Sequence, residues 1–193
     1  RELTPVGAPL LDTGGEVKSL AFSPDGRTLA AVTAANGGGY LTLWDVSSRS
    51  RLHEPLYAGN PSWVLAVGFS PDGTTLATAS SELGLQLWDA ATGDLDEPGR
   101  GGSASDIAFS ADGAMIASGS DHGVAEVWDA ATRTSIATFD GTPADSVALS
   151  PDGHFLAVGG DGRVVRVWDV RTRKLVHELD QGGNGAFTLE FSP

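Results

Sequence analysis

Four histidines and the acids beside them are the side chains with the most chemical capacity, and their spacing favours no reaction. His53 and His177 each lie nine residues after a tryptophan and directly before a glutamate. They therefore occupy one position in two different units of the chain and cannot share a ligand, and one histidine with one acid does not make a metal site. His154 and His122 have no nucleophile near them, so we interpret both as turn or surface residues.

The acidic stretch Asp94-Leu95-Asp96 begins like a calcium loop, but Pro98 and Ser105 stand where such a loop needs carboxylate or amide ligands. The sequence contains no Gly-x-Ser-x-Gly, no Gly-x-x-x-x-Gly-Lys and no complete Gly-x-Gly-x-x-Gly, despite 26 glycines. Because cysteine is absent, neither a disulfide nor a thiolate metal site can form. We therefore expect no catalytic residue, no metal and no cofactor, and we predict that the protein is not an enzyme.

The elements that would have to position any site come from a repeat. A Phe-Ser-Pro-Asp-Gly motif, or a close variant of it, recurs at intervals of about 40 residues. Its first residues are Phe22, Phe69, Phe109, Leu149 and, cut short by the chain end, Phe191. A Trp-Asp pair follows each complete motif, at Trp44-Asp45, Trp88-Asp89, Trp128-Asp129 and Trp168-Asp169. A period near 40 with a constant internal phase indicates a repeat architecture.

Each unit predicts four short antiparallel strands, which we label a to d. In Ser-Pro-Asp-Gly, the proline presets the first turn position and the glycine takes the left-handed one, so a hairpin joins strands a and b. Strand c alternates up to its tryptophan, which carries the largest buried area of the unit. The aspartate that follows stands three residues before a serine or threonine, a composition typical of a turn whose side chains bind its own backbone.

These motifs resemble the WD-repeat β-propeller family, over essentially the whole chain. The resemblance implies blades of four strands arranged radially, with strand a lining a central channel. It also implies a role as a scaffold for other macromolecules. We predict an all-β propeller segment with blades at 16–58, 59–98, 99–139 and 140–180, an outer strand at 1–15 and a first strand of a fifth blade at 181–193. The eight residues of the Trp-Asp pairs are predicted to be structural.

The sequence departs from the family in its histidines. Many WD repeats carry a histidine nine residues before the motif, and here these positions hold Thr13, Asn60, Arg100 and Asp140. The position in the b–c turn that usually pairs with this histidine holds Glu82, His122 and Gly162 in the three regular units. The tryptophan indoles therefore need other acceptors, for which hydroxyls on strand b such as Ser80 or Ser118 are candidates.

Four blades are fewer than the ring of about seven that is usual for WD repeats. We therefore expect an excerpt of a longer propeller, or of one completed by another polypeptide, which alone forms an open arc. Its exposed blade faces should associate with one another.

Composition limits the partners. The net charge of −13 disfavours nucleic acid, and the sequence contains no run of eighteen apolar residues, so no membrane insertion is expected. The lack of cysteine fits the cytoplasm. Five of the twelve cations fall in the last full unit, and we interpret them as solvated turn and outer-strand residues rather than a basic edge: Arg163, Arg166, Arg171, Arg173 and Lys174.

Positions that vary between units are free of the demands of the fold and indicate where a partner binds. At the start of strand a, Trp63 replaces the Glu16 of the first unit, and it is either an interface anchor or local packing over the next blade. Glu82 and His122 should lie on the same rim. We predict a protein-binding scaffold or regulatory module of a larger bacterial signalling protein. The alternative is a ligand-sensing or enzymatic propeller with a site in the channel, for which Lys18, Asp106 and Asp145 are the polar residues on strands a.

Overall fold

The computed structural model describes residues 10, 15–35, 37–60, 64–100, 102–120, 122–140, 143–160, 162–180, 182 and 188–192. These residues contain strands and turns and no helix. Blade 1 holds β1 (Glu16–Phe22), β2 (Thr28–Ala35), β3 (Gly38–Asp45), β4 (Ser50–Arg51) and β5 (Leu56–Gly59); blade 2 holds β6 (Val64–Phe69), β7 (Thr75–Ser80), β8 (Gly84–Asp89) and β9 (Leu95–Arg100). Blade 3 holds β10 (Asp106–Phe109), β11 (Met115–Gly119), β12 (Val124–Asp129) and β13 (Ser135–Asp140); blade 4 holds β14 (Ser146–Leu149), β15 (Phe155–Gly159), β16 (Val164–Asp169) and β17 (Lys174–Asp180).

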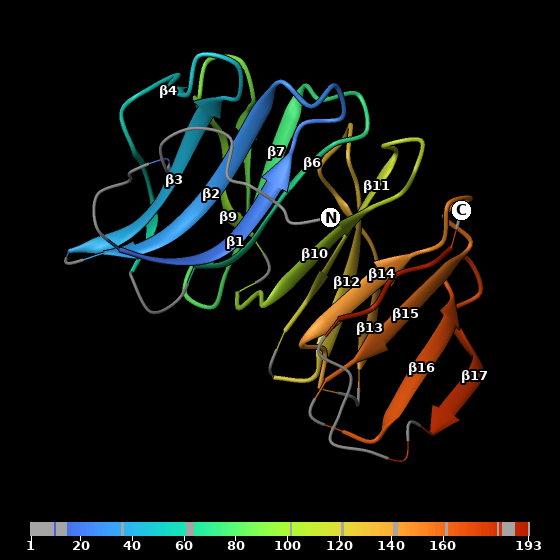
Figure 1. Ribbon diagram of the computed structural model, residues 1–193. Helices are drawn as coiled ribbons and strands as arrows, with labels where there is room; N and C mark the ends of the chain where they lie inside the picture. Colours follow the sequence, from blue (N-terminus) through green and yellow to red (C-terminus); the bar gives the residue numbers. More distant parts are fainter. Residues whose placement is uncertain are drawn as a thin grey trace, which may run out of the picture.

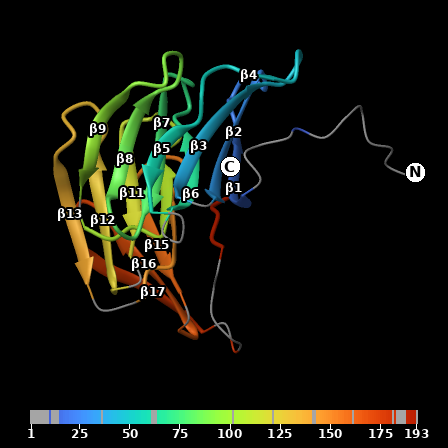
Figure 2. The ribbon, with the colours of Figure 1, turned by 90° about the vertical axis from the view of Figure 1, so that its left-hand side faces the viewer.

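Each blade is an antiparallel sheet whose strands pair in chain order. The four sheets stand face to face in succession, and neighbouring inner strands touch, β1 with β6, β6 with β10 and β10 with β14 (Figures 1 and 2). The sheets do not close into a ring (Figure 1). The predicted all-β fold of four-stranded blades is therefore confirmed.

The outer strand of blade 1 differs from the expected single strand d. It is split into β4 and β5, which both pair with β3. Pro55 lies directly before β5 and has no amide to donate to a ladder, which explains the interruption. The predicted outer strand at 1–15 lies almost wholly outside the described residues.

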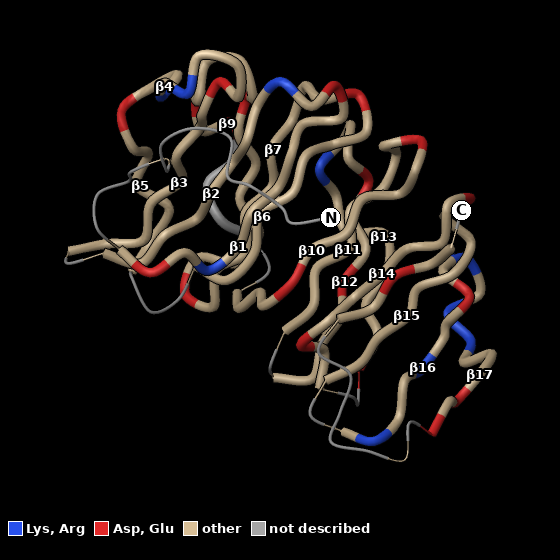
Figure 3. Tube along the Cα trace, viewed as in Figure 1, with Lys and Arg blue, Asp and Glu red and all other residues tan. Residues whose placement is uncertain are grey.

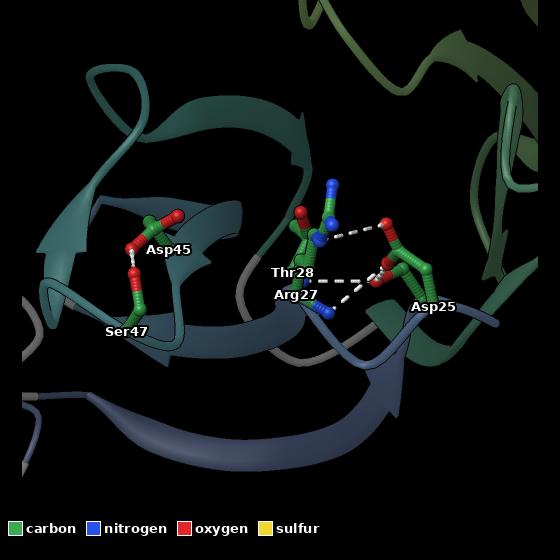
Figure 4. Close-up of polar contacts among 6 residues, drawn as sticks. Asp25, Arg27, Thr28, Asp45 and Ser47 are labelled. Carbon is green, nitrogen blue, oxygen red and sulfur yellow. Dashed lines mark hydrogen bonds and ion pairs between the residues drawn. The ribbon is translucent and has the colours of Figure 1, made fainter.

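The hairpin turns between strands a and b form as predicted. Gly26 has a φ of 69°, and the three equivalent glycines have φ between 69° and 74°. The Ser23 hydroxyl donates to Asp25 at 2.7 Å and accepts the Thr28 amide at 2.9 Å, while Asp25 accepts the Arg27 amide at 3.0 Å (Figure 4). The same serine and aspartate bonds recur in the other three blades. The motif recurs because its serine ties the turn to strand b.

The c–d turns also satisfy their own backbone. Asp45 Oδ1 accepts the hydroxyl of Ser47 at 2.7 Å (Figure 4) and the amide of Ser48 at 2.6 Å. These hydrogen bonds lower the pKa of Asp45 to about 2, and the bond from the Ser48 amide has the largest effect. The next turn residue has a positive φ in all four blades, at Arg49, Gly93, Arg133 and Arg173. Three of these residues are arginines, which bear a backbone strain that glycine avoids.

The hydrophobic core lies between the blades. Trp88 of blade 2 is 3% exposed and packs with Leu41 and Leu43 of blade 1. Trp128 of blade 3 packs in the same way with Leu85 and Leu87 of blade 2. Trp88 and Trp128 thus face the preceding blade, and each interior blade depends on its neighbours for burial.

Two of the four indoles find a hydroxyl. Trp128 Nε1 donates to Ser118 at 3.1 Å, as predicted, and Trp88 Nε1 donates to Thr78 at 3.0 Å. Ser80 as the acceptor for Trp88 was wrong, because its hydroxyl accepts the amides of Glu82 and Leu83 in the b–c turn. The register places Ala31 in blade 1 and Val158 in blade 4 at the acceptor position. Neither side chain can accept a hydrogen bond; Trp44 instead lies under Arg51, and Trp168 packs on Phe139 with ring centroids 5.6 Å apart.

Candidate partner-binding rim

The rim is the edge of the arc at which the b–c turns emerge and the inner strands begin. Register fixes this edge, since Glu16 at the start of β1 pairs with Ala34 near the end of β2. Acidic segments stand at this edge at the starts of β1 and β10 (Figure 3). Glu16 forms an ion pair with Lys18 at 2.8 Å, so the first predicted rim residue is partly neutralised by its own strand.

Glu82 sits in a turn that other atoms hold. Its amide and that of Leu83 each donate to Ser80 Oγ at 3.2 Å. The exposed side chain is left to reach sideways, where Oε2 accepts the amide of Asn60 at 3.3 Å. Asn60 belongs to the link that enters blade 2, so Glu82 connects a b–c turn to the link beside it.

His122 is held in the same manner one blade further along. Its amide donates to Ser120 Oγ at 3.0 Å, and its side chain is exposed. A serine at the end of strand b thus accepts backbone amides of the turn in both blades. Trp63, the other predicted rim residue, lies outside the described residues.

Two polar residues of the inner strands, Lys18 and Asp106, have partners within the described part of the chain. Lys18 is paired with Glu16. Asp106 Oδ1 accepts the amide of Ile107 at 2.9 Å, and Oδ2 accepts that of Val147 at 3.0 Å. Burial raises the pKa of Asp106 despite these bonds. Asp106 thus joins two inner strands, and within the described part of the chain no group of three or more His, Cys, Asp or Glu residues could hold a metal ion.

Asp106 belongs to a series of inter-blade bonds that the sequence analysis missed. Three positions before its motif, Ser19 accepts the amide of Val67 of blade 2 at 3.3 Å. Ser146 in the same position of blade 4 accepts the amide of Leu189 at 3.0 Å. Blade 2 has Ala66 there, which has no acceptor. The signal was present in the sequence, since this position reads Ser, Ala, Asp and Ser in successive units.

A second series joins the outer edges. Arg133, in a c–d turn, donates to Asp96 Oδ2 of the preceding blade at 3.1 Å. Arg173 donates to the carbonyl of Ile136, the position equivalent to Asp96, at 2.6 Å. Between blades 1 and 2, where the turn residue is Gly93, His53 Nε2 lies 3.0 Å from the carbonyl of Ala91 instead. His53, predicted as a surface residue, is half-buried at this junction.

The cations of blade 4 have mostly local partners. Arg166 pairs with Glu178 at 2.8 Å, and Arg163 with Asp180 at 3.7 Å, both across to β17. Arg171 and Lys174 are exposed. Two of the five cations are therefore neutralised within the blade and one is used between blades.

Shallow grooves lie between successive hairpin turns on the edge opposite the rim. One of about 300 Å³ is lined by Asp25, Phe69 and Asp72, and one of about 200 Å³ by Asp72, Phe109 and Asp112. Hydrogen bonds from Ser23, Ser70 and Ser110 lower the pKa of these aspartates, which already serve their own turns. The grooves therefore offer ionised carboxylates with structural roles rather than a reactive group.

Comparison with known proteins gives one result. The family model "WD domain, G-beta repeat" matches at residues 9–45, 52–89, 98–129 and 133–169. A search of curated proteins found no match. Among the described residues no helix is long and apolar enough to cross a membrane.

Proposed function

Because the chain belongs to the WD40 repeat family, we propose that it is a non-enzymatic scaffold or regulatory module that binds a protein partner through its rim. WD40 repeats generally mediate protein–protein interaction. We place the scaffold within a larger signalling protein of a bacterial cytoplasm, on the Ala- and Gly-rich texture of the repeats and the lack of cysteine.

One observation carries the proposal: hydroxyls at the end of strand b hold the backbone of the two turns that present the exposed side chains of Glu82 and His122. Hydroxyls of Ser80 and Ser120 hold the backbone of both turns. A turn whose backbone is held by the fold can present side chains to a partner. The Asn60 amide donates to Glu82, and Trp63 comes three residues after Asn60 in the sequence. Trp63 adds an aromatic side chain of the kind that anchors interfaces.

The test is a binding comparison between matched variants. Proteins captured from cell extract by the intact chain are purified, and their affinities are measured for the wild type and for a variant with alanine at Trp63, Glu82 and His122. We expect the affinity of at least one partner to fall by about 30-fold or more, since buried aromatic anchors contribute 2 kcal/mol or more.

The control carries alanine at three exposed residues of the outer side, Glu54, Ser135 and Thr138. It should bind as the wild type does, and both variants should keep the wild-type circular dichroism spectrum. Unchanged affinity of every partner for the rim variant would place binding elsewhere and refute the proposal.

A further inference from the structure

Among the described residues, the side of blade 1 that faces away from blade 2 has no neighbouring sheet. Its inner strand exposes Leu20 and Phe22 by 58% and 62%. The equivalent residues of blade 4, Val147 and Leu149, are 2% and 7% exposed because blade 3 covers them. We call Val17, Leu20 and Phe22 the leading face of blade 1. It has the composition of an inter-blade surface and the exposure of a free one.

Arg49 gives a second, independent observation on the same side. It occupies the c–d turn position of Arg133 and Arg173, with the same positive φ of 58°. Those two arginines reach back to the outer strand of the preceding blade. The side chain of Arg49 is exposed and has no partner among the described residues. Blade 1 thus carries the outer connector of a junction as well as the inner apolar face.

The segment 188–192 shows what the other end of the arc accepts. It runs along β14 (Figure 1), where Leu189 and Phe191 pack against Ala148, Ala157 and Val165. Its Leu189 amide donates to Ser146, the bond that Val67 makes to Ser19 between complete blades. The segment therefore occupies the place of an inner strand on blade 4, although it forms no ladder with another strand.

The sequence of this segment repeats that of β1. Thr188-Leu-Glu-Phe-Ser192 corresponds to Ser19-Leu-Ala-Phe-Ser23, with the leucine and the phenylalanine in the same register to the Ser-Pro that follows. Leu189 and Phe191, which cover blade 4, are thus equivalent to Leu20 and Phe22, which are exposed on blade 1. β1 carries the same two anchors and brings the rest of a blade with it.

We propose that the leading face of blade 1 docks on blade 4 of a second copy of this chain, where β1 replaces segment 188–192. Leu20 and Phe22 then pack where Leu189 and Phe191 lie, and the Leu20 amide donates to Ser146. Arg49 donates to the carbonyl of Val176, which is equivalent to Ile136. The same docking at both ends joins two copies by a two-fold axis into a ring of eight blades, a size found in propellers. This surface is separate from the rim and does not depend on the proposed function.

The experiment measures the mass of the full chain by light scattering over a concentration series. Replacing Leu189 and Phe191 by serine removes the competing anchors, so dimers should form at a concentration at least about tenfold lower than for wild type. Adding Phe22→Glu to this variant should restore the monomer at all concentrations. Adding Arg49→Ala instead should weaken the dimer by about fivefold, the effect of one exposed connector.

The control is Leu95→Lys on the same background, which alters an exposed leucine of β9 in an interior blade and should leave the dimer unchanged. A chain that stays monomeric after the Leu189 and Phe191 changes overturns the proposal. So does a dimer that Phe22→Glu does not affect, or an assembly that grows beyond two copies. A wild-type circular dichroism spectrum for Phe22→Glu shows that its loss of association is not a loss of fold.

Discussion

Changing each repeat tryptophan to phenylalanine separates the hydrogen bond of the indole from its packing. Trp44 and Trp128 are the matched pair, since both are 7% exposed, but only Trp128 donates to a hydroxyl, that of Ser118 at 3.1 Å. Phenylalanine keeps most of the apolar contact and leaves the Ser118 hydroxyl without its donor. We expect Trp128→Phe to lower the free energy of unfolding by about 1 to 2 kcal/mol more than Trp44→Phe.

The measurement is urea unfolding followed by far-ultraviolet circular dichroism, which does not depend on the tryptophans as probes. Equal slopes with denaturant would show that the variants unfold the same amount of surface, so that midpoints can be compared. Trp88→Phe, which loses the bond to Thr78, should resemble Trp128→Phe. Trp168→Phe, with no hydroxyl at its register position, should resemble Trp44→Phe.

A double-mutant cycle checks the assignment. With Ser118→Ala already present, Trp128→Phe should cost about 1 kcal/mol less than in the wild type, because the partner is already gone. Trp128→Ala should cost about 3 to 5 kcal/mol in either background, since it opens the contact with Leu85 and Leu87. If Trp44→Phe and Trp128→Phe prove equally costly, the bond to Ser118 contributes nothing and the reasoning fails.

Two further predictions concern carboxylates. Asp106→Ser should keep the inter-blade bond to the Val147 amide, as Ser146 does for Leu189, so its free energy of unfolding in urea should exceed that of Asp106→Ala by about 1 kcal/mol. Because burial raises the pKa of Asp106, the wild type should lose stability as the pH rises from 3.8 through that raised pKa. Thermal melts of both variants should lack this pH-dependent loss. The turn aspartates have the opposite sign, since hydrogen bonds within the turns lower their pKa values. The pKa of Asp45 is lowered to about 2, so its contribution to stability is complete above pH 3.8 and is lost as the pH falls towards 2. Asp45→Asn should reduce this loss in an acid titration followed by circular dichroism.

The sequence was sufficient for the turns of each unit and for its strands a to c. The Ser-Pro-Asp-Gly hairpins, the aspartate-led turns and the alternation up to each tryptophan depend on neighbours within a few residues, and all of them form as predicted. The bonds between blades were not predicted, because they join residues 37 to 48 positions apart whose meeting depends on how the sheets stack. Ser80 as a candidate acceptor in blade 2 failed for a different reason, since only the register of neighbouring strands places Thr78 rather than Ser80 beside Trp88.

The sequence predicted which residues lie at the rim but not the contacts that their side chains make. Comparison of the units indicated Glu16, Glu82 and His122 as variable positions, and the structure places Glu82 and His122 on turns that other residues hold. The comparison of the units did not indicate that Lys18 pairs with Glu16, because that ion pair depends on side-chain conformation rather than on sequence spacing. Whether the rim binds a partner stays a prediction.

Ala66 occupies the inner-strand position that holds a hydrogen-bond acceptor in the other three blades, so the junction between blades 2 and 3 differs from the other two. The junction between blades 1 and 2 is held by Ser19 at the inner strand and by His53 at the outer edge. The junction between blades 3 and 4 is held in the same two places by Asp106 and Arg173. Between blades 2 and 3 the described residues have no such side-chain bond at the inner strand; Arg133 donates to Asp96 at the outer edge, and the Ala104 amide donates to the Ser80 carbonyl at the rim at 2.9 Å. Because this junction lacks the inner side-chain bond of the other two, we expect the curvature of the arc to vary most easily there. Small changes of curvature at this junction would let the arc fit partners of different width.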